Sequence, residues 1–131
     1  MDFETQWKKV VEKEALLQAE LHRNLQRDIL AEFEQMKSRV QQIDKDMIKS
    51  GIKGIDAKVS KQSIQFLNTN ISFYYRDGDD SSGISSSIQV TQGSRGPREY
   101  FGVRSKDGEI TWQIAGGIVI FKTEQLLEVL I

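Results

Sequence analysis

The chain has 131 residues, a formal net charge of −1 and no cysteine. Its length indicates one domain, or a small domain with an extension, and its near-neutral charge argues against a general polyanion binder. The lack of cysteine excludes disulfides and thiolate metal sites. The first twenty residues are too charged for a signal peptide or a membrane span, so we expect a cytoplasmic protein without membrane contact.

Residues 1–50 are predicted to form one long amphipathic helix. No glycine or proline occurs between residues 2 and 50, and apolar residues recur every three or four positions, which is helical spacing. Glu14 alone interrupts an apolar stripe of Phe3, Trp7, Val10, Leu17, Leu21, Leu25, Ile29, Phe33, Met36, Val40, Ile43 and Met47. Gly51 is expected to end the helix in the left-handed conformation. An alternative break near His22 would fold the helix back on itself, but neither glycine nor proline supports it.

The length of this stripe indicates that another surface covers it. At 1.5 Å per residue the helix spans roughly 70 Å, whereas the remaining chain of about eighty residues can build only a modest core. We therefore expect that the helix either assembles copies of the chain into a homo-oligomer through coiled-coil contacts or docks a partner helix. The predicted oligomer interface consists of Trp7, Val10, Leu17, Leu21, Leu25, Phe33 and Met36.

Residues 51–131 are predicted to form a small antiparallel β-domain with a short C-terminal helix. From Ala57 onward the apolar pattern alternates, as is typical of strands. A meander of about five to six strands is predicted, at 63–67, 71–76, 84–91, 100–105, 109–114 and 118–121. Gly116-Gly117 predicts a bend, and Thr123 is expected to cap the final helix. The fold class is therefore α+β.

The pair Asp107-Gly108 predicts a two-residue hairpin turn, which fixes a register. In that register Arg104 pairs with Thr111, and Val103 pairs with Trp112. Alternation then assigns one set of side chains to the core: Ile71, Phe73, Tyr75, Ile84, Ile88, Val90, Phe101, Val103, Ile110, Trp112 and Ile114.

The opposite sheet face and one loop supply the candidate binding residues. That face carries tyrosines and arginines, which are enriched at binding hot spots, although an exposed polar sheet face is common. Residues 93–99, GSRGPRE, are predicted as a loop whose glycines and arginines suit a phosphate or carboxylate, or as an ordinary hairpin loop. The predicted ligand or partner site is Arg95, Arg98, Arg104, Arg76, Tyr74 and Tyr100.

No residue pattern points to catalysis, a metal or a cofactor. His22 is the sole histidine, and Glu32 and Glu34 are two positions apart, so they do not share a helix face. The acidic loop from Asp77 lacks the glycine position and the bidentate glutamate of a calcium loop. We therefore expect that the protein is not an enzyme and holds neither metal nor cofactor.

Three functions fit these features. The first is a non-enzymatic, oligomeric binding protein of adaptor or inhibitor type, acting through a protein partner. The second is nucleotide or nucleic-acid binding, with arginines on phosphate and tyrosines stacking on bases. The third is a structural assembly element. Small size without catalytic motifs is typical of many binding proteins of phages and mobile elements.

Overall fold

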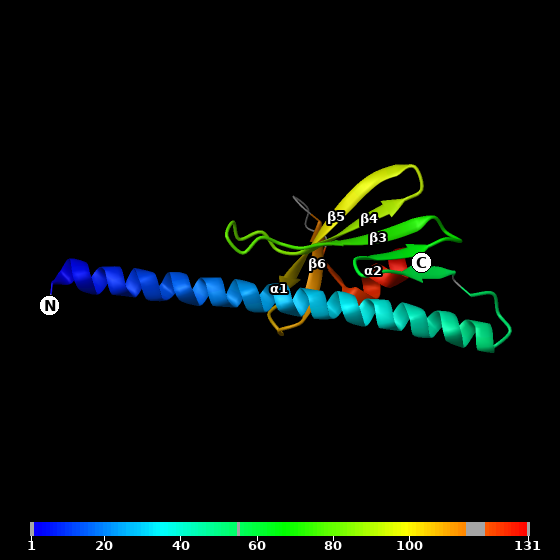
Figure 1. The fold of residues 1–131 in the computed structure, drawn as a ribbon, viewed down its shortest axis with the longest axis horizontal. Helices are drawn as coiled ribbons and strands as arrows, with labels where there is room; N and C mark the ends of the chain where they lie inside the picture. Colours follow the sequence, from blue (N-terminus) through cyan, green and yellow to red (C-terminus); the bar gives the residue numbers. More distant parts are fainter. Residues whose placement is uncertain (1, 55, 115–119, 131) are drawn as a thin grey trace.

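The computed structural model describes residues 2–54, 56–114 and 120–130. A long helix, α1 (Phe3–Lys49), precedes an antiparallel sheet, and a short helix, α2 (Thr123–Leu130), follows it (Figure 1). The strands are β1 (Ala57–Val59), β2 (Ser63–Phe66), β3 (Ile71–Arg76), β4 (Ser87–Gln92), β5 (Arg95–Arg104), β6 (Ile110–Ile114) and β7 (Ile120–Lys122). The predicted α+β fold is confirmed, with seven strands in meander order instead of five to six.

Helix α1 is continuous, so the alternative break near His22 does not occur. Asp2 caps its start by accepting a hydrogen bond from the Glu4 amide. At its end Gly51 has a φ of 76°, and its N–H donates to the Ile48 carbonyl at 3.1 Å. The Ile52 N–H donates to the Met47 carbonyl at 3.0 Å, which completes a Schellman motif. The predicted termination at Gly51 is confirmed.

Two segments differ from the predicted strands. The three-residue β1 is too short to show alternation in the sequence. The predicted 93–99 loop is mostly strand, because a two-residue turn at Gly93-Ser94 lets β5 begin at Arg95. Pro97 is tolerated there because the pairing register shifts between Val90 and Gln92, and proline is confined to bulges and edges of sheets.

The β5–β6 register is shifted by one residue from the prediction. Arg104 pairs with Ile110, and Gly102 pairs with Trp112. Gly108 has a φ of 85° and donates its N–H to the Ser105 carbonyl, which makes a three-residue hairpin loop instead of a two-residue one.

A one-residue shift exchanges the two faces of a strand. Tyr100 is therefore buried in the core, whereas Phe101 is half-buried and Val103 exposed on the outer face. The prediction placed all three on the opposite sides and was wrong. Ile84 was also predicted as core, but it precedes β4 and is exposed.

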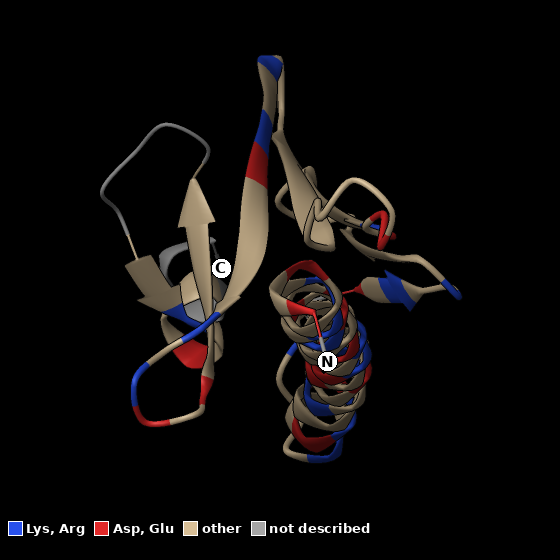
Figure 2. Cartoon of the chain, turned by 90° about the vertical axis from the view of Figure 1, so that its left-hand side faces the viewer, with Lys and Arg blue, Asp and Glu red and all other residues tan. Residues whose placement is uncertain are grey.

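The core lies between the C-terminal half of α1 and the concave face of the sheet, which curls around the helix (Figure 2). Ile29, Phe33, Met36 and Val40 of α1 are fully buried against it. Trp112 is fully buried at its centre, as predicted.

The indole of Trp112 links β6 to α2. Its Nε1–H donates to the Thr123 hydroxyl at 2.9 Å. Thr123 is the first residue of α2, not its cap, and the Gln125 side chain accepts from the Lys122 N–H instead. Trp112 therefore anchors the C-terminal helix as well as the sheet.

Two expectations concern the chain after β6. The predicted bend at Gly116-Gly117 lies outside the described residues. Ile120, expected within a buried strand, is exposed in β7. Among the described helices, none combines the length and apolarity needed to cross a membrane.

Candidate protein interface

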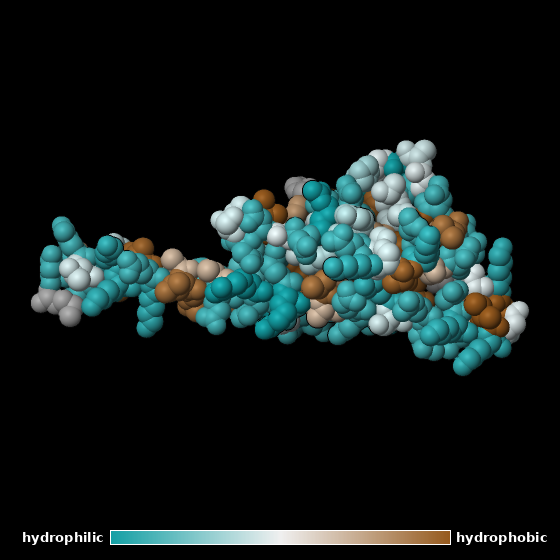
Figure 3. Space-filling view, in the orientation of Figure 1, coloured by the Kyte–Doolittle hydropathy of each residue, from teal (hydrophilic) through white to brown (hydrophobic). Residues whose placement is uncertain are grey.

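The N-terminal part of α1 extends beyond the sheet, and no other described part of the chain covers it (Figure 1). We call residues 3–21 of α1 the arm. Phe3 is 76% exposed, Trp7 61% and Leu21 53%, and Val10 and Leu17 are also exposed. Figure 3 shows apolar side chains along this free segment. Large apolar side chains gathered on an exposed surface typically mark an interaction site.

The stripe changes direction where the arm meets the β-domain. From Phe3 to Leu21 its steps alternate between four and three, so it stays on one side through about five helical turns. From Leu21 to Phe33 every step is four residues, and each advances the stripe by about 40°. The buried half of the stripe therefore faces the sheet, while the arm's half points on average about a quarter of a turn away from it.

The split of the stripe into a buried half and an exposed half corrects part of the predicted oligomer interface. Phe33 and Met36 are fully buried in the chain's own core, and Leu25 packs against that core. They are not available to a second copy without unfolding the β-domain. Trp7, Val10, Leu17 and Leu21 remain available. Phe3 and Val11 were left out of the predicted interface, although the stripe and its doublet at 10–11 indicated them.

Polar contacts mark the boundary between the arm and the β-domain. His22 Nδ1 lies 2.8 Å from the Asp80 carboxylate. One turn later, Gln26 accepts from the Ser86 N–H at 2.7 Å and donates to the Ile84 carbonyl at 3.2 Å. Gln26 carries no sequence signal for this role, because its partners lie 58 and 60 positions away. These bonds fasten the loop between β3 and β4 onto α1.

The predicted Tyr/Arg surface is only partly assembled. Tyr74 and Arg76 lie exposed on β3, on the outer sheet face. Arg76 lies 3.4 Å from the Glu99 carboxylate, which also accepts from the Ser87 hydroxyl. Tyr100 lies in the core and cannot stack on a ligand.

The remaining arginines lie at opposite ends of β5. Arg95 and Arg98 are exposed near the tip of the β4–β5 hairpin, and neither makes an ion pair within the described residues. Arg104 instead pairs with Asp28 of α1 and donates to the Gly108 carbonyl. The six predicted residues therefore do not form one pocket.

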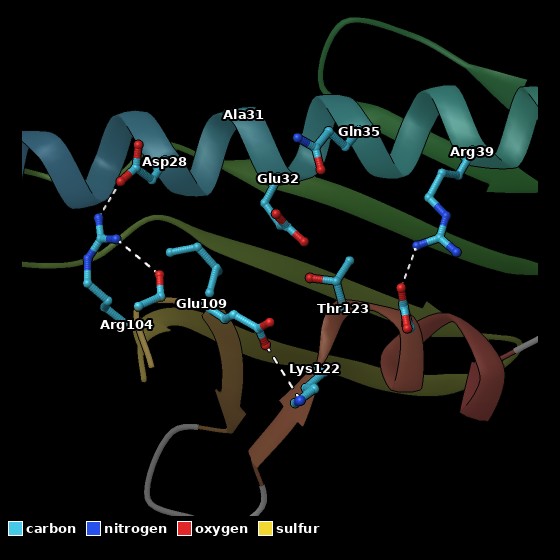
Figure 4. A pocket seen from close by; sticks show the side chains of 12 residues that line it. Asp28, Ala31, Glu32, Gln35, Arg39, Arg104, Glu109, Lys122 and Thr123 are labelled. Atoms are coloured by element: carbon cyan, nitrogen blue, oxygen red, sulfur yellow. Dashed lines mark hydrogen bonds and ion pairs between the residues drawn. The ribbon is translucent and has the colours of Figure 1, made fainter. Parts of the chain in front are cut away.

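A groove of about 490 Å³ lies between α1 and the β6–β7–α2 end of the β-domain (Figure 4). Ion pairs cross it at Asp28–Arg104 and Arg39–Glu124, and Glu109 pairs with Lys122 on its β-domain side (Figure 4). These pairs neutralise every charged side chain of the lining except Glu32. Since the charges satisfy one another, the groove offers little to a charged ligand, and no cluster among the described residues suits a metal.

Acidification is expected to lower the free energy of unfolding through Asp28. The hydrogen bond from Arg104 holds the pKa of the Asp28 carboxyl below its ordinary value, because it favours the charged form. A lowered folded-state pKa stabilises the protein above the unfolded-state pKa, and this contribution is lost as pH falls from about 5 to about 2.

Chemical denaturation between about pH 6 and pH 3 measures this effect, and Asp28→Asn should make the pH dependence shallower. Asp79 and Asp107 also have lowered pKa values, caused by hydrogen bonds from the hydroxyls of Ser81 and Ser105. These two residues should therefore preserve part of the pH dependence of the unfolding free energy in the Asp28→Asn variant. A variant slope equal to that of the parent would contradict the role of the Asp28–Arg104 pair.

Comparison with known proteins identifies no relative: no family model, curated protein or solved structure matches the chain.

Proposed function

We propose that the protein is a non-enzymatic, oligomeric binding protein of adaptor or inhibitor type, which assembles through the arm. The uncovered stripe from Phe3 to Leu21 carries this proposal. The β-domain, fastened to the other half of α1, then presents the outer face of its sheet to a protein partner. Tyr74, Phe101, Val103 and Ile120 are among the aromatic and apolar residues of that face.

Burial energetics support assembly. Covering one large apolar side chain contributes about 1.5–3 kcal/mol, and the arm carries several of them in a row. Half of α1 already gains this contribution from its own sheet, whereas the arm gains it only from a second surface. Its exposed polar positions keep the free chain dispersed in water, which permits a concentration-dependent equilibrium.

Replacing Leu17 by glutamate is expected to abolish self-association. The change places a charge in the centre of the stripe, where assembly would have to desolvate it. Light scattering over a range of protein concentrations measures the mass of the assembly. Circular dichroism should show an intact fold, because Leu17 contacts nothing in the β-domain.

The matched control is Leu16→Glu. Leu16 is 70% exposed and lies one position away, but about 100° around the helix from Leu17 and off the stripe. We expect this variant to associate as the parent does. A parent chain that stays monomeric at tens of micromolar, or equal loss in both variants, would overturn the assembly proposal.

Nucleic-acid binding is the second candidate, favoured by Arg95 and Arg98 near the hairpin tip, which are exposed and make no ion pair with any described residue. Such binding would weaken with added salt, because phosphate contacts release counterions. We expect the double variant Arg95→Ala with Arg98→Ala to abolish any electrophoretic mobility shift of a labelled oligonucleotide. Arg76→Ala is the control, since Arg76 pairs with Glu99. An unchanged shift in the double variant would exclude the tip.

A structural assembly element is distinguished by its lack of a further partner. The double variant Tyr74→Ala with Val103→Ala removes two side chains of the outer sheet face. Both the adaptor or inhibitor proposal and the structural-element proposal expect it to assemble as the parent does. Only the adaptor or inhibitor proposal expects these changes to weaken capture of a protein from the native host.

A further inference from the structure

We infer that two copies of the chain pair their arms in antiparallel orientation, with Phe3 of one copy level with the partner's Leu21. This inference rests on the proposed function, since it specifies how the arm meets a second copy. It places the two β-domains at opposite ends of a short two-helix junction. Each copy then presents its outer sheet face separately.

The spacing of the arm fits a reversed copy of itself. The stripe positions 3, 7, 10, 14, 17 and 21 are separated by steps of 4, 3, 4, 3 and 4, a series that reads the same in both directions. In antiparallel register Phe3 lies level with the partner's Leu21, and Trp7 lies level with the partner's Leu17. Each layer of such a coil then contains one residue from each copy of the stripe.

Glu14, the only charged residue of this stripe, decides between the two orientations. In a parallel pair, each Glu14 would share a layer with the partner's Glu14, and like charges in direct contact repel. In the antiparallel pair the two carboxylates lie four positions, or about 6 Å, apart along the axis. Each Glu14 then shares a layer with the partner's Val10 instead of with a like charge.

The boundary of the β-domain limits the overlap at the same place. The contact of His22 with Asp80 brings the loop between β3 and β4 against α1, immediately after Leu21. A reversed arm that begins at Phe3 therefore ends where this loop begins. A longer overlap would gain no further free apolar position, because Leu25 packs against the chain's own core, and a shorter one would leave apolar side chains uncovered. The overlap of about 19 residues corresponds to about 28 Å of helix.

Disulfide trapping tests the orientation, and the absence of native cysteine makes the result unambiguous. Full-length Phe3→Cys carrying a mass tag is mixed with untagged Leu21→Cys in a glutathione buffer, and the products are separated by size. We expect the mixed Phe3→Cys/Leu21→Cys disulfide to exceed either homodisulfide at least tenfold. Leu16→Cys, which lies off the stripe, is the control for random collision.

The possible outcomes separate this inference from the proposed function. A dominant Leu21→Cys homodisulfide would show parallel pairing and overturn the inference while leaving assembly intact. A dimer by scattering that forms no disulfide above the Leu16→Cys level would also overturn the inferred register. Monomeric scattering with no disulfide would overturn the proposed function itself.

Discussion

Trp112→Ala is expected to lower the free energy of unfolding by about 3–5 kcal/mol, as truncation of a fully buried aromatic side chain does. Trp112 has no exposed surface and lies in β6, between β5 and β7. Its loss would leave a cavity under α1 and leave the Thr123 hydroxyl without its donor at the start of α2. Since a domain has only about 5–15 kcal/mol of stability, this change removes a large share.

Trp7→Ala is the matched control, because Trp7 is the chain's other tryptophan and lies on the exposed arm. Both changes should be compared by urea denaturation in a Leu17→Glu background, which separates folding from assembly. We expect Trp7→Ala to change the unfolding free energy by less than about 0.5 kcal/mol there. Equal losses for the two variants would contradict the assignment of Trp112 to the core and Trp7 to the interface.

Gly102→Val is expected to have the second large effect, because the Ile29 side chain of α1 packs directly against Gly102 of β5. A Cβ added at Gly102 would lie 2.6 Å from Ile29 Cγ1 and 2.7 Å from its Cδ1. No carbon pair tolerates that distance, so the Ile29 side chain or the whole of α1 would have to shift. Overpacking a core costs about 1–3 kcal/mol, and valine adds two further methyl groups.

The control is Gly96→Val in the same strand, where an added Cβ meets no atom within 4 Å. We expect its effect on the unfolding free energy to be small. Combining Gly102→Val with Ile29→Ala should restore part of the stability, because the smaller side chain vacates the clash. Additive losses in the double variant would mean that Gly102 and Ile29 do not contact one another.

Local patterns identified much of the fold because they depend on neighbours in the chain. The three- and four-residue spacing identified α1, and Gly51 identified its end. Trp112 was predicted correctly as a core residue, although it was predicted to pair with Val103 of β5 and in fact pairs with Gly102. Strand β1 was missed because three residues cannot display alternation.

Contacts between distant residues were not predictable in the same way. Gln26 bonds to Ser86 across 60 positions, and Asp28 pairs with Arg104 across 76 positions. Such polar residues on a helix look like an ordinary solvated face. The candidate binding residues were separated by such effects: Arg104 pairs with the distant Asp28, and the one-residue register change at the Gly108 turn moved Tyr100 into the core.

The long helix, its apolar stripe and the antiparallel meander could all be predicted from the order of residues, because helical periodicity and side-chain alternation are local properties. Which half of the stripe is covered became clear only from the packing of α1 against the sheet. That outcome depends on where the sheet docks, and the approach of Ile29 to Gly102 places it on the C-terminal half. The arm is left exposed because it extends beyond the edge of the sheet, where no described part of the β-domain lies beside it (Figure 1).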